Sequence, residues 1–462
     1  MGGVPTNDLR RLHGLSRAAG LTPVPAGRLR VRRRSLLTAA AATTLAAAPL
    51  ATGCGPSSPP PASSGGSSRR GHLTYGVWDV YQVPAMNRAA REFERTRPGV
   101  TIDVQLTPNG TYWTKLRTAC TGGAAPDVFW MNGGNFGLYA DAGQLLPLET
   151  EGSDAVLRPA DFPADLVSLY RWKGTQYGVP KDFDTVALWY NKEIFDRAKV
   201  DYPDSSWSWQ DLISNAQRLT DRKRGIYGVG APARNQENYY NSIPQAGGWV
   251  ISEDKKHSGF SDEHTREGLR LWIDLIHRYR ASPSLQQMTD TDPTQMFQSG
   301  TLAMTYEASY NAATFYRDRE LRAKVDVAPM PKGRHRASIL HGLANVVYAR
   351  TPHPELAREF VQFLGGEQAS LLQGKYGTAI PARDGTAKPW AAGMPEFDLQ
   401  VHLDALDYSV PYPSSTNTAA WQHKEQMWLA KAWSGDESLT GATDSLTDAM
   451  NQLLAQERKG RS

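Results

Sequence analysis

Aromatic, acidic and amide side chains stand where two strands are predicted to end. Trp78 and Asp79 close the alternating segment HLTYGVW (72–78) and its continuation, and Asn132 follows DVFWM (127–131). Open α/β sheets bind ligands at the carboxyl ends of their strands, so these side chains are expected to share one edge. An indole stacks on a flat apolar face, while carboxylate and amide oxygens accept hydrogen bonds from hydroxyls. The set predicts recognition of a ligand with flat C–H faces and a hydroxyl rim, as in a saccharide.

Two further positions fit the same chemistry. Asp182 and Asp184 lie two residues apart in PKDFDTVALWYN (180–191), so an extended backbone points both the same way, and Lys181 is a candidate ion-pair partner for one of them. Trp249 follows Gly247 and Gly248, which allow close backbone approach and can present the indole at a loop edge. Stacking on a ligand and burial in the core both remain open for Trp249.

The elements that must position these residues alternate between strand and helix. After the first strand, residues 84–98 show helical spacing of Met86, Ala89, Ala90 and Phe93 and stop at Pro98. A strand is predicted at 100–106 and a helix at 111–120. Later come a helix at 262–279 capped by Ser261, strands at 324–331 and 345–349, and helices at 354–366 and 444–456. This order predicts an α/β fold with a mainly parallel sheet, and the length predicts two lobes.

The N-terminal region has the composition of an export signal. A basic segment, RVRRRSLL (30–37), precedes an uncharged, alanine-rich run (36–53), and small residues then lead to Cys54. The run contains Pro49 and four threonines in 18 residues, which disfavours a stable membrane span. Residues 55–70 are rich in proline, serine and glycine and predict a flexible tether.

The same region resembles two known signals. ATGC (51–54) is similar to the lipobox of bacterial lipoproteins, which implies lipid attachment at Cys54, and RRSLL (33–37) resembles a twin-arginine export motif. Thirty residues before the arginines are long for a leader, so translation is predicted to start downstream of Met1, with Val31 as one candidate. Cys120, the second of two cysteines, is predicted to be a helix packing residue without a disulfide.

The charge balance does not point to a nucleic-acid partner. Eight arginines and one aspartate lie in residues 1–53, so removing them changes the net charge from +4 to about −3, with 43 basic and 46 acidic residues. Thirteen tryptophans and nineteen tyrosines supply aromatic faces for a core or for a ligand cleft.

A series of motifs in order carries a family resemblance. These are APDVFWMNGGNFGLYADAGQLLPL (125–148), YGVPKDFDTVALWYNKEIF (177–195), WSWQDL (207–212), QAGGWV (245–250), MFQSGTLAMTYEASY (296–310), APMPKG (328–333) and GTAIPAR (377–383). Together they resemble the extracellular sugar-binding components of ABC importers, the maltose-binding-protein-like family, over nearly all of residues 72–456. The resemblance implies a two-lobed periplasmic-binding-protein type II fold, with lobes joined by multiple crossovers and a sugar held between them.

The resemblance also implies boundaries, partners and location. Residues 1–53 would be the signal and 54–70 the tether, with lobe one formed by 71–183 and 332–390 and lobe two by 184–331 and 391–462. The partners would be a sugar and the permease subunits of an ABC importer. The protein is expected to be a monomer held by lipid at the outer face of the cell membrane, with no catalytic residue and no cofactor.

Several site residues follow from the resemblance. It puts a sugar-contacting acid and the first crossover at Asp184, and a polar–aromatic pair at Glu237 with Tyr239 or Tyr240. Tyr310, in EASY, stands where relatives often carry tryptophan, with Glu307 beside it as a candidate acceptor. The remaining positions implied in this way are His341, Arg383, Tyr112 and Trp421.

Two other classes remain open. A secreted glycosidase or lyase would also combine aromatic residues with paired carboxylates, although the chain contains no GxSxG, HExxH, cysteine-pair or P-loop motif. A binder of another solute, such as iron, polyamine, phosphate or peptide, is not excluded by motifs. The aromatic and amide set favours a sugar.

Overall fold

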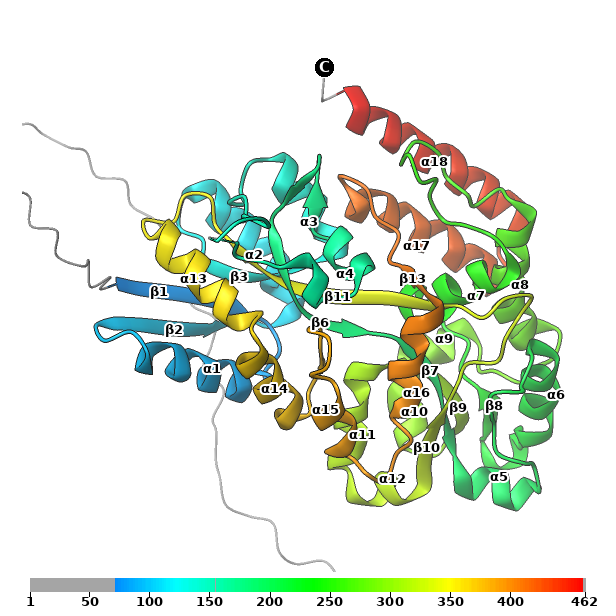
Figure 1. Cartoon of the computed structure of the whole chain (residues 1–462). Coiled ribbons are helices and arrows are strands. Elements are labelled where there is room, and N and C mark those ends of the chain that lie inside the picture. The colour runs from blue at the N-terminus through cyan, green and yellow to red at the C-terminus, as the bar shows by residue number, and fades with distance from the viewer. Residues whose placement is uncertain (1–70, 154, 460–462) are drawn as a thin grey trace, which may run out of the picture. The chain divides into compact units, whose positions relative to one another are not determined.

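The computed structural model describes residues 71–153 and 155–459 (Figure 1). The signal, the tether, Cys54 and the start-site prediction lie outside this part of the chain. Among the described residues, no helix is long and apolar enough to cross a membrane.

Two β-sheets form the centres of two lobes. The first has the order β12-β6-β11-β3-β1-β2, with β13 paired to β11, and the second has the order β10-β7-β9-β8. The strands of the first sheet are β1 (Gly71–Val77), β2 (Val100–Leu106), β3 (Val128–Asn132), β6 (Gly178–Asp184), β11 (Ser338–Val347), β12 (Ile380–Pro381) and β13 (Ser409–Pro411). Those of the second are β7 (Val186–Asn191), β8 (Tyr227–Val229), β9 (Leu302–Ala308) and β10 (Val325–Ala328). A separate two-stranded ribbon consists of β4 (Arg171–Trp172) and β5 (Thr175–Gln176).

The helices surround these sheets. Those of the first half of the described chain are α1 (Val83–Arg95), α2 (Asn109–Gly122), α3 (Gly133–Asp141), α4 (Ala164–Ser168), α5 (Lys192–Ala198), α6 (Trp209–Leu219), α7 (Tyr240–Ala246) and α8 (Glu263–His277). The later ones are α9 (Leu285–Asp290), α10 (Pro293–Gln298), α11 (Ala312–Arg317), α12 (Arg319–Lys324), α13 (Pro354–Leu364), α14 (Glu367–Tyr376), α15 (Lys388–Ala392), α16 (Gln400–Asp404), α17 (Thr418–Ser434) and α18 (Leu439–Lys459).

Local sequence explains most of these elements. Helix α1 buries the predicted Met86, Ala89, Ala90 and Phe93 against the first sheet and ends before Pro98, so that prediction is confirmed. Helix α8 is capped by Asp262 and not by Ser261, because the Asp262 carboxylate accepts a hydrogen bond from the backbone N–H of Thr265 at 3.0 Å. Cys120 is buried within α2, as expected for a packing residue.

The first sheet is mixed, whereas the alternation of elements predicted a mainly parallel one. Strands β1, β2 and β3 are parallel, but β11 is antiparallel to both β3 and β6. Strand β11 runs this way because the chain enters it on returning from β10 of the second sheet. The α/β class itself is confirmed.

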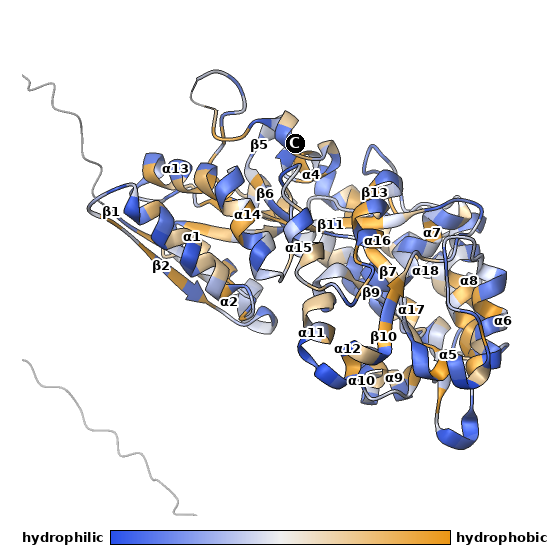
Figure 2. Ribbon diagram, turned by 60° about the horizontal axis from the view of Figure 1, so that its bottom comes forward, coloured by the Kyte–Doolittle hydropathy of each residue, from blue (hydrophilic) through white to orange (hydrophobic). Residues whose placement is uncertain are grey.

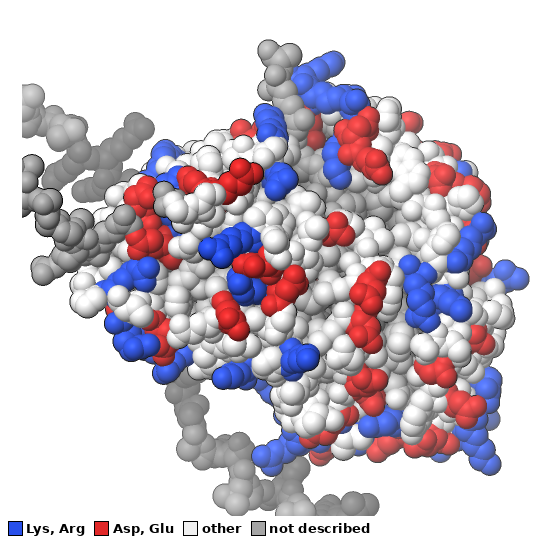
Figure 3. Space-filling view, viewed as in Figure 1, with Lys and Arg blue, Asp and Glu red and all other residues white. Residues whose placement is uncertain are grey.

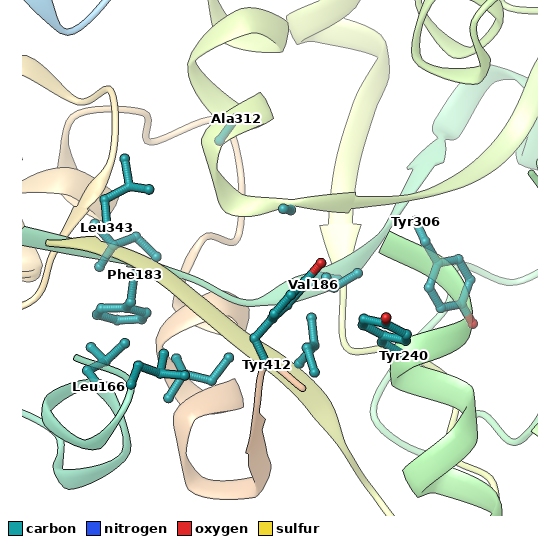
Figure 4. Packing of buried hydrophobic residues seen from close by; sticks show 14 of the residues in the cluster. Leu166, Phe183, Val186, Tyr240, Tyr306, Ala312, Leu343 and Tyr412 are labelled. Atoms are coloured by element: carbon teal, nitrogen blue, oxygen red, sulfur yellow. The ribbon is translucent and has the colours of Figure 1, made fainter. Parts of the chain in front are cut away.

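The chain passes between the sheets along neighbouring strands. Only Thr185 separates β6 of the first sheet from β7 of the second, and β11 brings the chain back. In Figure 4, Tyr412 lies between Phe183 and Leu343 on one side and Tyr240 on the other, close to these crossing strands. Figure 2 shows hydrophobic colour along strands of both sheets, and residues of both sheets belong to one continuous cluster of buried hydrophobic side chains.

Candidate functional site

A cavity of about 830 Å³ lies between the two lobes. From the first lobe it is lined by Trp78, Asp79, Asn132 and Asp182, and from the second by Gln236, Tyr310, Asn311 and Thr314. Asp184, His341 and Tyr412, at the crossing segments, complete the part discussed below. Its volume falls within the range for small-molecule sites.

The end of β1 supplies an aromatic platform. The Trp78 ring packs edge-on against Tyr112 at 4.8 Å and Trp130 at 5.2 Å between ring centroids, and lies 5.4 Å from Trp113. Tyr112 is buried behind this platform and donates its hydroxyl to the Trp130 carbonyl at 2.9 Å. Tyr112 therefore supports the cavity wall without lining it.

Two polar residues at the strand ends accept hydrogen bonds from the turns that follow them. Asp79 accepts from the backbone N–H of Tyr81 at 2.8 Å and from the Gln82 side chain at 3.1 Å, just before α1. Asn132 accepts from the backbone N–H and side chain of Asn135, both at 3.0 Å, at the start of α3. Asn132 is therefore both the N-cap of α3 and a cavity-lining residue, whereas Asp79 lines the cavity from the turn that precedes α1.

A β-bulge in β6, at Lys181, lies directly before Asp182. The pairing of β6 with β11 shifts at Lys181, so this side chain and its neighbour Asp182 meet instead of pointing apart. The Lys181 ammonium donates to Asp182 at 2.6 Å and to Gln82 at 2.6 Å, and it lies 4.3 Å from the centre of the Trp130 ring. The other Asp182 oxygen accepts from the Leu343 N–H at 3.0 Å. Asp182 thus borders the cavity with its charge already paired.

Asp184 has fewer hydrogen-bond partners than Asp182. One oxygen accepts from the Ser309 hydroxyl at 3.2 Å, and the other lies 3.6 Å from Nδ1 of His341. That separation is too long for a hydrogen bond, and Nδ1 of His341 is buried without a hydrogen-bond partner. His341 packs against Tyr412, with 4.9 Å between ring centroids.

The second-lobe wall comes from two turns. Tyr310 and Asn311 belong to a 3₁₀ turn after β9, and Gln236 and Glu237 belong to a π-helical turn, Asn235–Tyr239, before α7. The Tyr310 hydroxyl donates to Glu237 at 2.6 Å, and its side chain is 39 % exposed. Glu307 lies behind Asn311, which donates to it at 2.6 Å, and burial raises the pKa of Glu307 to about 7.

A second cavity of about 480 Å³ adjoins this wall. We call it the annex; Arg234, Glu237 and Thr294 line it, and it shares Tyr310 and Asn311 with the main cavity. Arg234 forms an ion pair with Asp292, and it also interacts electrostatically with Glu307 and Glu237. Of the residues expected in the site, Glu237 and Tyr239 line the annex, and Tyr310 lines both cavities.

The structure brings together seven of the residues expected in a binding site. Those lining the main cavity are Trp78, Asp79, Asn132, Asp182, Asp184, Tyr310 and His341. Sequence reasoning missed other lining residues, among them Tyr81, Gln82, Gln236, Asn311, Tyr412 and Gln422. Two of them could have been found from their place in the sequence, because Gln236 and Asn311 each adjoin a residue that was expected in the site.

The other expected residues lie elsewhere. Tyr240 is buried and donates to Glu425 at 2.8 Å, and Trp421 is buried with its indole N–H on the Ser415 hydroxyl at 2.9 Å. Arg383 pairs with Asp161 at 2.9 Å. Each of these three side chains has a structural partner outside the main cavity.

Trp249 also lies outside the main cavity, although it is 40 % exposed. Its two preceding glycines have structural causes. Gly247 ends α7 with φ of 89°, and a Cβ on Gly248 would lie 2.5 Å from the backbone nitrogen of Thr265 in α8. The glycines therefore allow α7 and α8 to approach, and they do not place the indole on the cavity.

Comparison with known proteins agrees with this architecture. The family model described as bacterial extracellular solute-binding protein matches residues 80–370. A putative binding protein of Brucella abortus is 22 % identical over 286 residues, covering 61 % of this chain and 68 % of the relative. An arabinooligosaccharide-binding protein of Halalkalibacterium halodurans is 24 % identical over 250 residues, covering 53 % and 55 %.

Solved structures share the fold. An ABC substrate-binding protein of Listeria monocytogenes in complex with cycloalternan superposes with a TM-score of 0.77 at 24 % identity, over 84 % of this chain and all of that one. The GacH receptor of Streptomyces glaucescens, solved unliganded and with acarbose, gives 0.73 at 23 % identity, over 84 % and 99 %. Since the family model spans more than half of the chain, the protein belongs to the bacterial extracellular solute-binding protein family.

Proposed function

We propose that this protein binds an extracellular saccharide in the cavity between its lobes and delivers it to the permease subunits of an ABC importer. The observation that carries the proposal is the composition of the cavity: a backed indole at Trp78, a facing Tyr310, and carboxylate and amide groups between them. Aromatic rings stack on the C–H faces of a sugar, and the polar groups pair with its hydroxyls.

The names of similar proteins support the same class. An arabinooligosaccharide-binding protein and a maltotriose-binding protein are among the relatives, and proteins in complex with cycloalternan or acarbose are among the structural neighbours. The main cavity and the annex share Tyr310 and Asn311, which favours a ligand longer than one sugar ring.

A binding role is favoured over glycoside hydrolysis by the state of the two β6 acids. A glycosidase needs two available carboxyl groups, one of them able to give up a proton to the leaving group. Both oxygens of Asp182 are engaged, one by Lys181 and one by the Leu343 N–H. Asp184 accepts one hydrogen bond, from Ser309, and so has more capacity left than Asp182 to accept hydrogen bonds from sugar hydroxyls.

A thermal-shift screen over mono- and oligosaccharides tests the proposal, followed by calorimetry and a turnover assay on chromogenic glycosides. A ligand at about 100 times its dissociation constant stabilises the fold by roughly 2.7 kcal/mol. Saturable binding without turnover is the expected result. Turnover, or stabilisation by a polyamine or iron and by no sugar, would contradict it.

Asp184 is proposed to govern ligand discrimination. Asp184→Asn keeps the shape but removes the charge and one acceptor, so we expect a loss of about 1.5–3 kcal/mol in binding. Deoxy analogues of the ligand should lose less additional affinity in Asp184→Asn than in the parent. Unchanged affinity together with unchanged discrimination would remove Asp184 from the site.

We further propose that Cys54, outside the described residues, carries lipid and anchors the mature protein at the outer face of the membrane. Lipid attachment would leave residues 55–70 as a tether for the lobes. The variant Cys54→Ser, expressed in the native host, should be released or misprocessed. Full membrane retention of that variant would contradict the anchor.

A further inference from the structure

The charged groups lining the main cavity are unbalanced. Three carboxylates, Asp79, Asp182 and Asp184, line it, and no lysine or arginine does so among the described residues. We propose that the saccharide taken by this protein carries a protonated amine, and that sugars bearing an acid group are rejected. This inference rests on the proposed function and specifies the chemical class of its ligand.

One of the three carboxylates does not contribute to the imbalance. Lys181 lies behind the wall, in contact with Asp182 at 2.6 Å, and both side chains are almost fully buried. Since the pair is neutral overall, Asp182 offers little attraction to a ligand cation. Among the described residues, neither Asp79 nor Asp184 forms an ion pair with a lysine or arginine, and the ring beside Asp184 is that of His341 at 3.6 Å.

Asp79 accepts only from neutral donors. Its partners are the backbone N–H of Tyr81 and the side-chain amide of Gln82. Neutral donors stabilise a carboxylate but leave its negative charge uncompensated. At the first-lobe end of the cavity, this charge is therefore available to a positively charged group.

Asp184 and His341 bring a carboxylate oxygen and an unpartnered ring nitrogen close together at the crossing strands. Oδ2 of Asp184 and Nδ1 of His341 are 3.6 Å apart, and Nδ1 has no hydrogen-bond partner although His341 is only 8 % exposed. When the neutral ring carries its proton on Nε2, Nδ1 accepts. An ammonium has three donors and can give one to each atom, whereas a hydroxyl has a single donor.

The second-lobe wall adds no charged residue to the main cavity, and Glu237 and Arg234 line the annex together. Glu237, at the junction with the annex, is held by the neutral Tyr310 hydroxyl. The nearby cations are already engaged: Arg234 pairs with Asp292, and the Arg317 guanidinium lies over the Tyr81 ring at 4.4 Å from its centroid. Neither of them lines the main cavity.

The molecular surface provides a contrast. On the face drawn in Figure 3, lysine and arginine side chains are interspersed with aspartate and glutamate. Such mixing produces no strong preference for ligand charge. Within the cavity, the acids are not matched by lining cations, and partial removal from solvent strengthens their effect on a ligand charge.

Matched sugar series test the inference. For glucose, galactose and mannose, each series contains the parent sugar, its 2-amino-2-deoxy form, the N-acetyl form and the uronic acid, and acetylated and deacetylated oligosaccharides extend the set. Calorimetry at pH 7 should show at least one amine bound about tenfold more tightly than its hydroxyl parent, a difference of about 1.4 kcal/mol. The N-acetyl form controls for size, and the uronic acids should not bind measurably.

Two variants identify the origin of the preference. Asp184→Asn should reduce the advantage of the amine over the parent sugar to about twofold, while Asp448→Asn should retain it. Asp448 is an exposed residue of α18 outside the cavity, so its variant makes the same change in net charge. A thermal melt of each variant verifies the fold.

The possible outcomes distinguish a failure of this inference from a failure of the proposed function. If hydroxyl sugars bind as tightly as amines, or if a uronic acid binds, the inference is overturned and the proposed function stands. If no saccharide of any series binds, the proposed function itself fails. If Asp184→Asn and Asp448→Asn weaken the amine preference equally, the preference does not arise in the cavity and the inference is also overturned.

Discussion

The two walls of the cavity hold their buried carboxyl groups in different ways. In the first lobe, Asp182 is neutralised by the ammonium of Lys181 at 2.6 Å. In the second, Glu307 has its oxygens on Thr294, Thr305 and Asn311, and burial raises its pKa to about 7. The first wall therefore keeps a fixed ion pair, whereas the second uses a carboxyl group that protonates near neutral pH. The stability of the protein should therefore respond to mutation of the ion pair in the first wall, and to pH through the carboxyl group in the second.

The largest expected effect comes from breaking the ion pair. Lys181→Met leaves Asp182 buried without its cation, and removing one partner of a buried pair costs about 3–5 kcal/mol in unfolding free energy. Urea denaturation measures the loss. As a control, Lys173→Met removes the exposed pair with Asp141 and should cost about 1 kcal/mol or less. Equal losses in the two variants would contradict the distinction between buried and exposed pairs.

The second effect is a dependence of stability on pH. Burial raises the pKa of Glu307 from its ordinary value of 4.5 to about 7, so between these values the folded protein holds a proton that the unfolded chain releases. The contribution of Glu307 to stability therefore falls as pH rises through this window, by at most about 1.4 kcal/mol per pH unit. Above about pH 7 this contribution no longer changes.

Glu307→Gln should be less dependent on pH than the parent in this window. Denaturant midpoints at pH 5, 6, 7 and 8 provide the comparison. Part of the fall should remain, because burial also raises the pKa of Glu425, to about 8. Identical pH profiles for the parent and Glu307→Gln would show that Glu307 ionises normally in the folded protein.

A smaller effect, on ligand affinity, distinguishes Trp78 from Trp249. Trp78→Ala removes the platform that lines the cavity, and aromatic stacking contributes about 0.5–1.5 kcal/mol beyond burial, so affinity for the saccharide should fall about tenfold or more. Trp249→Ala, outside the cavity, should change affinity less than twofold, the smallest effect predicted. Calorimetry with the ligand found in the screen measures both. A larger loss in Trp249→Ala than in Trp78→Ala would reverse the assignment.

The difference between the walls also explains what could be predicted from sequence. Trp78, Asp79 and Asn132 were expected because strand periodicity indicates where β1 and β3 end, and an α/β sheet puts ligands at those ends. The pair Asp182 and Asp184 followed from the period of two in an extended strand. The bulge at Lys181 was not visible, because it depends on the register with β11, a strand about 160 residues later.

The second wall was harder to predict because turns carry it. Gln236 lies in a π-helical turn that packs against α7, α8 and β9, and Asn311 lies in a 3₁₀ turn that packs against α11. Trp249 and Trp421 have side chains that could stack on a sugar. Whether each indole is buried, and whether it faces the cavity, depends on the tertiary structure and not on the local sequence. Of the second-lobe residues expected there, Tyr310 alone lines the main cavity, and Glu237 lines the annex.

The most direct test of the account is a crystal structure of the protein with the saccharide selected by the screen. We expect the sugar to lie in the cavity between the lobes, with one ring face on Trp78, a polar group on Asp184, and Asp182 still paired with Lys181. A sugar bound elsewhere on the molecule, with this cavity containing only water, would contradict the central claim.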